Sequence, residues 1–240
     1  MSIIDLTHWH FQLGRGTSVL VAHGLASPPT VLQFRTALDL LKHLANDETW
    51  QAEIQNSISR RLKADPEAKN WHRKRDFLKN LRHYPKYKGR YYDTYHEAAR
   101  NLAYGTSTAQ QTSMVNGLNS EIVASKVTVP QGQILFHGRA DQALAATASY
   151  PTFISTSLDP VVAICSALRR AGVGAKSGHP TVYMLTTRDP LPAMWGNGGK
   201  PHEWEVLLGT NLSCQPATTH HGSRFDIAEA TVGIKVGVSS

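Results

Sequence analysis

The chain has 240 residues, of which 41% are hydrophobic and 18% charged, and its formal net charge at pH 7 is +7. This length buries one sizeable core, or a core with a smaller helical part, and excludes a short peptide. No segment approaches the roughly 18 consecutive apolar residues of a membrane-spanning helix. Residues 1–16 also lack the basic head and apolar run of a secretory signal, so we expect a chain made in the cytoplasm, with no membrane partner.

The front of the chain has a helical pattern. Ile54, Ile58 and Leu62 follow one another at spacings of four, which places them on one apolar helix face. The predicted helical regions are 30–80, 93–104 and 112–124.

The positive charge is concentrated in residues 60–90. This segment holds twelve basic and three acidic residues, so it carries +9 and the rest of the chain carries −2. The aromatic residues Trp71, Phe77, Tyr84 and Tyr87 lie among these charges, a combination typical of proteins that bind single-stranded nucleic acid. The alternative is a solvated helix whose aromatic side chains pack on the core.

The sequence pattern of the back half is typical of a β-sheet. Short runs rich in β-branched and aromatic residues are separated by Gly, Pro and Asn. The predicted strands are 133–136, 152–155, 181–186, 204–208, 224–228 and 230–236. Helices followed by strands predict an α+β fold, with an α-helical N-terminal portion followed by a mixed or antiparallel sheet.

The cysteines and histidines show no metal-binding pattern. Cys165 and Cys214 are too few for a disulfide framework or a structural zinc site, so both are expected to be buried thiols. The adjacent pair His220 and His221 lacks a nearby cysteine and carboxylate set with metal spacing. We therefore expect no metal cofactor.

Glu203 and Glu205 flank Trp204 on a β-type run. Alternate residues of a strand point to one face, which places the two carboxylates about 7 Å apart. Paired carboxylates suit glycosyl transfer, in which a fixed carboxylate stabilises the positive charge that develops at an anomeric carbon. The alternative is an acidic pair that faces solvent.

Three segments of the back half are informative together. They are ILFHGR at 134–139, FISTSLDPVVA at 153–163 and HEWEVLLGT at 202–210. In this order they resemble the arginine-serine-glutamate class of mono-ADP-ribosyltransferases, the class of the cholera and iota toxins. The resemblance covers about residues 90–236. It implies a split-sheet catalytic domain over 90–240 after a helical, basic portion at 1–89, with NAD as the donor of ADP-ribose.

The resemblance assigns roles to individual residues. Ser155 braces the NAD site, with Thr156 and Ser157 fixing its strand. Glu205 is the catalytic glutamate, which holds the nicotinamide ribose and stabilises the developing cation. Glu203 orients or deprotonates the acceptor.

The segment 193–200 corresponds in place to the acceptor-recognition loop of that family, and its three glycines suit a mobile loop. Trp195 is expected to stack on the acceptor, with Asn197 beside it.

The first motif departs from the family. The family has an arginine directly before the glycine, whereas this chain has His137 before Gly138 and Arg139 after it. In one alignment His137 takes the NAD-binding place, as histidine does in the diphtheria-toxin-like branch. In the other, Arg139 pairs with the NAD phosphates through its planar guanidinium. We favour His137, because Phe136 and Gly138 keep the spacing of the family.

Two acceptors fit the Glu-x-Glu pair. The family usually modifies arginine, but the exocyclic amino group of adenine is also a planar N–H₂ that a carboxylate can orient. The basic segment favours nucleic acid, RNA above all, and Arg73, Lys74 and Arg75 are its expected contacts. We therefore expect a toxin or effector that binds NAD and nucleic acid, or else a protein acceptor, with an antitoxin or immunity protein as a further partner. The alternatives are an NAD glycohydrolase and a basic nucleic-acid-binding module without activity.

Overall fold

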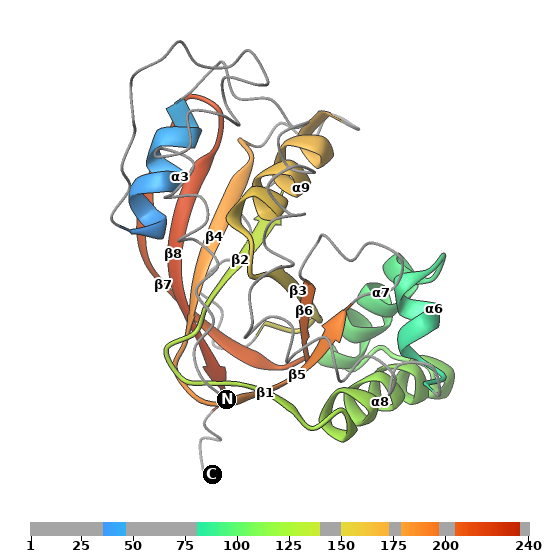
Figure 1. Ribbon diagram of the computed structural model, residues 1–240. Helices are drawn as coiled ribbons and strands as arrows, with labels where there is room; N and C mark the ends of the chain where they lie inside the picture. Colours follow the sequence, from blue (N-terminus) through green and yellow to red (C-terminus); the bar gives the residue numbers. More distant parts are fainter. Residues whose placement is uncertain (1–35, 47–80, 140–149, 173–178, 197–204, 236–240) are drawn as a thin grey trace.

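The computed structural model describes residues 36–46, 81–139, 150–172, 179–196 and 205–235 (Figure 1). These residues form one eight-stranded sheet with helices on its faces and at one end. The helices are α3 (Ala37–Asn46), α6 (Tyr84–Lys88), α7 (Tyr92–Ala103), α8 (Ala109–Ala124) and α9 (Pro160–Gly172). The strands are β1 (Val127–Val129), β2 (Ile134–Arg139), β3 (Ile154–Ser157), β4 (Thr181–Thr187), β5 (Leu191–Gly196), β6 (Glu205–Leu208), β7 (Leu212–His220) and β8 (Asp226–Ile234). The expected α+β class is confirmed.

The sheet is mixed and divides near its middle. Its strand order is β1-β5-β6-β3-β2-β4-β8-β7, and every neighbouring pair is antiparallel except β4 and β8. At the centre, β2 and β3 share a single registered pair, Phe136 with Ser157, whereas β2 and β4 share six. The sheet therefore splits between β2 and β3, and this is where the residues of the first two motifs meet.

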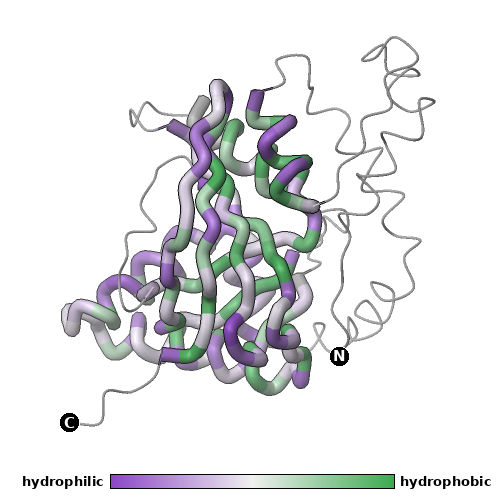
Figure 2. Tube along the Cα trace, turned by 90° about the vertical axis from the view of Figure 1, so that its left-hand side faces the viewer, coloured by the Kyte–Doolittle hydropathy of each residue, from purple (hydrophilic) through white to green (hydrophobic). Residues whose placement is uncertain are grey.

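Two clusters of buried side chains hold the helices to the sheet. The larger joins α3 and α9 to the strands, and Figure 2 shows the hydrophobic stretches that run along those strands. The smaller lies between α6, α7, α8 and the β3–β6–β5 part of the sheet, with Phe153, Met194 and Leu207 as its sheet-side members. Figure 1 shows these three helices together at one end of the molecule.

The predicted helices 93–104 and 112–124 are confirmed as α7 and α8. Helix α8 begins three residues earlier than predicted, because Thr108 and Gln111 form a capping box in which each side chain bonds the backbone N–H of the other. Within the predicted helical region 30–80, the structure describes 36–46, which contain α3. The remainder of that region lies outside the described residues.

The six predicted strands correspond to β2, β3, β4, β6 and β8, of which β8 unites the two predicted strands 224–228 and 230–236. Four elements of this half were not predicted: β1, β5, β7 and α9. Helix α9 begins where the Asp159 carboxylate accepts a hydrogen bond from the backbone N–H of Val161 at 2.9 Å, with Pro160 in the first helical position.

Candidate active site

Ser155 and Glu205 meet on the neighbouring strands β3 and β6. The antiparallel register pairs Ser157 with Glu205 and Ser155 with Leu207. The Ser155 hydroxyl donates to Oε1 of Glu205 at 2.5 Å. Glu205 is only 4% exposed, so this carboxylate is held in one orientation and largely removed from water. The two residues that the motifs single out are therefore in direct contact.

Thr156 and Ser157 bond to backbone around this pair. The Thr156 hydroxyl donates to the backbone carbonyl of Val206 at 2.7 Å, and the Ser157 hydroxyl accepts from the backbone N–H of Asp159 at 2.9 Å. Both side chains are buried. These two hydrogen bonds tie β3 to β6 and to the start of α9.

His137 lies on β2 directly across the split from Ser155. Its Nδ1 is 2.7 Å from the backbone carbonyl oxygen of Ser155, and since a carbonyl only accepts, Nδ1 carries the proton and donates. The ring is 8% exposed and lies 6.3 Å, centroid to centroid, from the Tyr183 ring. One hydrogen bond thus fixes the His137 ring against the strand that carries Ser155.

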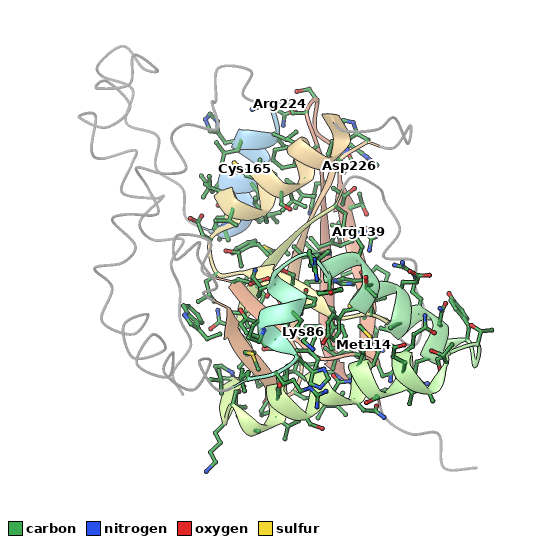
Figure 3. The ribbon with its side chains drawn as sticks, turned by 90° about the vertical axis from the view of Figure 1, so that its right-hand side faces the viewer. Lys86, Met114, Arg139, Cys165, Arg224 and Asp226 are labelled. Carbon is green, nitrogen blue, oxygen red and sulfur yellow. The ribbon has the colours of Figure 1, made fainter. Side chains whose placement is uncertain are left out.

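Arg139 lies two residues further along β2. Side chains two apart on a strand share a face, so Arg139 and His137 point to the same side of the sheet. Arg139 donates through Nη1 to the Tyr150 hydroxyl at 2.6 Å, and Figure 3 shows its place among the strands. Both alignments of the first motif therefore place a nitrogen donor on the same face of β2.

Gly138 permits a close approach between β2 and α9. A Cβ at this position would lie 2.0 Å from the backbone oxygen of Ala163 and 2.8 Å from the backbone nitrogen of Ala167. Only a residue without a Cβ fits there. The glycine of the first motif is thus explained by packing beneath the site.

Lys88 is a site residue that the sequence analysis did not single out. Its Nζ makes an ion pair with Oε2 of Glu205, although the two residues are 117 positions apart. Lys88 is the last residue of α6, at the end of the +9 segment. The only sequence signal was membership of that basic segment.

Of the two interpretations of the basic segment, Tyr84 and Tyr87 fit the one in which the aromatic side chains pack on the core. They are 2% and 0% exposed, because α6 turns its aromatic face into the smaller core cluster against Phe153 and Tyr95. Burial, together with the nearby Tyr92 and Glu205, raises the pKa of Tyr87 well above its ordinary value. Over residues 81–90 the aromatics face inward while Arg82, Lys86 and Arg90 are exposed, as the solvated-helix alternative describes. Trp71 and Phe77 lie outside the described residues.

Trp195 also differs from expectation. The segment 193–196, expected as part of a loop, belongs to β5, where Trp195 pairs with Val206 of β6. The Trp195 side chain is 2% exposed and belongs to the larger core cluster. The pairing of β5 with β6 turns the ring inward, so it does not form the exposed stacking surface that was predicted.

Five of the predicted site residues lie outside the described residues. They are Arg73, Lys74, Arg75, Asn197 and Glu203.

The two cysteines are buried, and each histidine of the adjacent pair lies beside a carboxylate. Cys165 and Cys214 are both buried free thiols, as predicted, and burial raises the pKa of Cys214 to about 11. His220 lies 2.7 Å from the Glu229 carboxylate, and His221 lies 3.1 Å from Asp226. Among the described residues no three His, Cys, Asp or Glu side chains form a metal-binding group. No helix in the described ranges is long and apolar enough to cross a membrane.

Several solved structures are similar to this one. The Vis toxin, an ADP-ribosyltransferase from Vibrio splendidus, superposes with a TM-score of 0.50 at 14% identity, over 82% of this chain and 91% of that chain. An ADP-ribosyltransferase from Clostridium botulinum has a TM-score of 0.47 at 17% identity, over 70% of this chain and 96% of that chain. Exoenzyme S from Pseudomonas aeruginosa, bound to carba-NAD and human 14-3-3 protein beta, has a TM-score of 0.44 at 16% identity, over 65% and 74% of the two chains.

No protein-family model matches the sequence, and no curated protein matches it either. The likeness to the Vis toxin nevertheless shows the fold of this chain. It is the ADP-ribosyltransferase fold, as the resemblance of the three motifs led us to expect.

Proposed function

We propose that this chain is an NAD-dependent mono-ADP-ribosyltransferase of the toxin or effector type, acting in the cytoplasm. The observation that carries the proposal is the buried Glu205 carboxylate, held by the Ser155 hydroxyl on the next strand and lying in an ADP-ribosyltransferase fold. A buried, oriented carboxylate is the group that stabilises positive charge at an anomeric carbon.

The reaction breaks the bond between the anomeric carbon of the ribose and the nicotinamide nitrogen of NAD. The bonding electrons leave with nicotinamide, and the ribose carbon gains positive charge. Glu205 accepts a hydrogen bond from the ribose hydroxyl and stabilises that charge, while Ser155 keeps the carboxylate aimed. The acceptor nitrogen then bonds to the ribose carbon and gives up a proton, for which we propose Glu203 as the base.

His137 and Arg139 are the proposed donors to NAD on β2. The imidazole of His137 is already fixed to the Ser155 backbone, whereas the planar guanidinium of Arg139 suits a phosphate. No metal takes part in the proposed chemistry, because a carboxylate and a good leaving group suffice for it.

For the acceptor we favour an amino group of a nucleic-acid base, in RNA before DNA. Arg82, Lys86 and Arg90 are exposed around helix α6, whose last residue, Lys88, touches Glu205. Positive charge beside the catalytic carboxylate supports an acceptor with a phosphate backbone. A protein arginine is the second candidate, carried by the Glu-x-Glu pair, and NAD hydrolysis is the third. A protein that modifies nucleic acid in its own cytoplasm needs a neutralising antitoxin or immunity partner, which we propose with it.

One assay tests this function. The protein is incubated with NAD labelled in the adenosine moiety, together with separate pools of RNA, DNA and protein. We expect nicotinamide release and label on RNA. Label on protein alone supports the arginine acceptor, nicotinamide release without any labelled pool supports a glycohydrolase, and intact NAD in all pools contradicts the proposal.

A further inference from the structure

We propose that Lys88 is a positioning residue that holds Glu205 in the orientation the reaction needs. This inference rests on the proposed function and adds to it a residue that none of the three motifs contains. It begins from the way the two oxygens of Glu205 are held by two different parts of the molecule. Oε1 accepts from the Ser155 hydroxyl on β3, and Oε2 pairs with the Lys88 ammonium on α6.

The Ser155 contact orients Glu205, and the Lys88 contact offsets its charge. The Ser155 hydroxyl is neutral, so it fixes direction but offsets little charge. Glu205 is 4% exposed, and a buried carboxylate is strongly destabilising when it lacks a partner of opposite charge. Lys88 supplies the opposite charge. Its own side chain keeps 19% of its surface exposed, so the ammonium remains partly hydrated while it contacts the carboxylate.

Helix α6 holds Lys88 in place from its other end. The Glu121 carboxylate of α8 accepts three backbone N–H groups at the start of α6: from Arg82 at 2.7 Å, His83 at 2.8 Å and Tyr84 at 2.8 Å. These are N–H groups that a helix start otherwise leaves without intrahelical partners, and a negative charge there is favourable.

The residue before Lys88 anchors the helix to the sheet. Tyr87 is fully buried, with its ring 5.9 Å from the Phe153 ring, and Phe153 directly precedes β3. Lys88 is therefore placed against Glu205 by a rigid element rather than by a free side chain. A carboxylate fixed before the substrate arrives needs no rearrangement during the reaction, which is the condition for effective electrostatic catalysis.

The kinetic test compares Lys88→Met with Lys42→Met. Both changes remove one positive charge from a helix, but Lys42 is an exposed residue of α3, whereas Lys88 pairs with Glu205. We expect Lys88→Met to lower kcat for NAD cleavage by about 10- to 100-fold, the effect of a misplaced catalytic group, with KM for NAD nearly unchanged. Lys42→Met should behave like the wild type, and Lys88→Arg should restore most of the turnover. Equal kcat for the two methionine variants, or a loss confined to KM, overturns the proposal.

A thermal-unfolding cycle tests the ion pair without NAD. The four proteins are the wild type, Lys88→Met, Glu205→Gln and the double variant. If the two side chains interact, their effects on Tm are not additive, because the second change removes a partner that is already absent. Additive shifts overturn the proposal whether or not the protein cleaves NAD. A wild-type protein that cleaves no NAD counts instead against the proposed function, and the cycle still decides whether the pair exists.

Discussion

At the residue scale, the site is built around one carboxylate that a small number of groups hold in place. Glu205 receives a hydroxyl from β3 and an ammonium from α6, while the His137 ring is fastened to the same strand as the hydroxyl. Each contact comes from a different element, so the carboxylate is defined by the fold and not by its immediate neighbours in sequence.

Replacing Glu205 with Gln keeps the shape of the side chain and removes its charge. We expect kcat for NAD cleavage to fall by at least ~10², with little change in NAD affinity, because the charge matters mainly in the transition state. Steady-state kinetics and a binding titration measure the two quantities. Glu229→Gln, a change at a carboxylate on β8 that bonds His220, is the matched control. Near-normal turnover in Glu205→Gln would remove this residue from catalysis.

Gly138→Ala tests the contact beneath the first motif. The added Cβ would meet the Ala163 backbone oxygen at 2.0 Å, so β2 or α9 must move. We expect a loss of about 1–3 kcal/mol in the free energy of unfolding, the typical effect of overpacking, measured by chemical denaturation. At Gly209 the nearest atom is the end of the Asn119 side chain at 2.9 Å, which two hydrogen bonds hold to Thr210. A side chain shifts at lower cost than backbone, so Gly209→Ala should lose less. Equal losses at both positions would contradict the packing account of Gly138.

At the element scale, the periodic helices were easier to predict from the sequence than the strands that contain proline. The periodic helices α7 and α8 were predicted to within a few residues, because their apolar spacing is set by their own turns. Strands β5 and β7 were missed because Pro192 and Pro216 interrupt their β-type runs, and proline ordinarily argues against a strand. Both prolines lie in strands near the two ends of the sheet order, where a missing backbone donor is tolerated.

The residues of the candidate site also differ in whether the sequence could predict them. Ser155 and Glu205 were both singled out because they lie on strands whose motifs carry the resemblance, and the structure places them in contact. Lys88 was missed because it reaches Glu205 across 117 positions, through packing of α6 that no local pattern encodes. The prediction for Trp195 was wrong because the glycines that follow it suggest a loop, whereas strand pairing turns its ring into the core.

Glu121 offers a test of how α6 is held. Glu121→Ala removes the acceptor of three backbone N–H groups, those of Arg82, His83 and Tyr84. We expect a loss of about 1–3 kcal/mol in stability, the range for leaving hydrogen-bonding groups unsatisfied, together with lower turnover as Lys88 shifts. Denaturation and NAD cleavage measure both. Glu97→Ala, a change on α7 away from the start of α6, serves as the control. Full stability in Glu121→Ala would show that packing alone holds α6.

At the scale of the whole molecule, charge is distributed so that the segment 60–90 carries +9 against −2 elsewhere. At its described end, residues 81–90, the aromatic residues face inward and Lys88 pairs with Glu205, while Arg82, Lys86 and Arg90 are exposed. Any affinity for nucleic acid at this end therefore comes from charge rather than from base stacking, and such affinity weakens steeply with salt.

Reversing Arg73, Lys74 and Arg75 to glutamate tests the acceptor. If the basic segment guides RNA, transfer to RNA should weaken, and the slope of log K against log salt should flatten by close to one unit for each phosphate that is no longer neutralised. NAD hydrolysis should be unchanged. Binding is measured across a salt series and transfer by label on RNA. Labelled protein with no labelled RNA, before and after the reversal, would favour the arginine acceptor.

Strand β7 forms one edge of the sheet, and its backbone groups are irregularly arranged. Among the described residues, Leu212 is bridged to Tyr150, Pro216 has no backbone N–H, and the register shifts between Pro216 and Thr219. An incoming strand therefore finds an interrupted row of backbone donors along this edge. We therefore expect that replacing Pro216 and straightening the irregularity would create a more continuous template and make the protein more prone to aggregate through this edge.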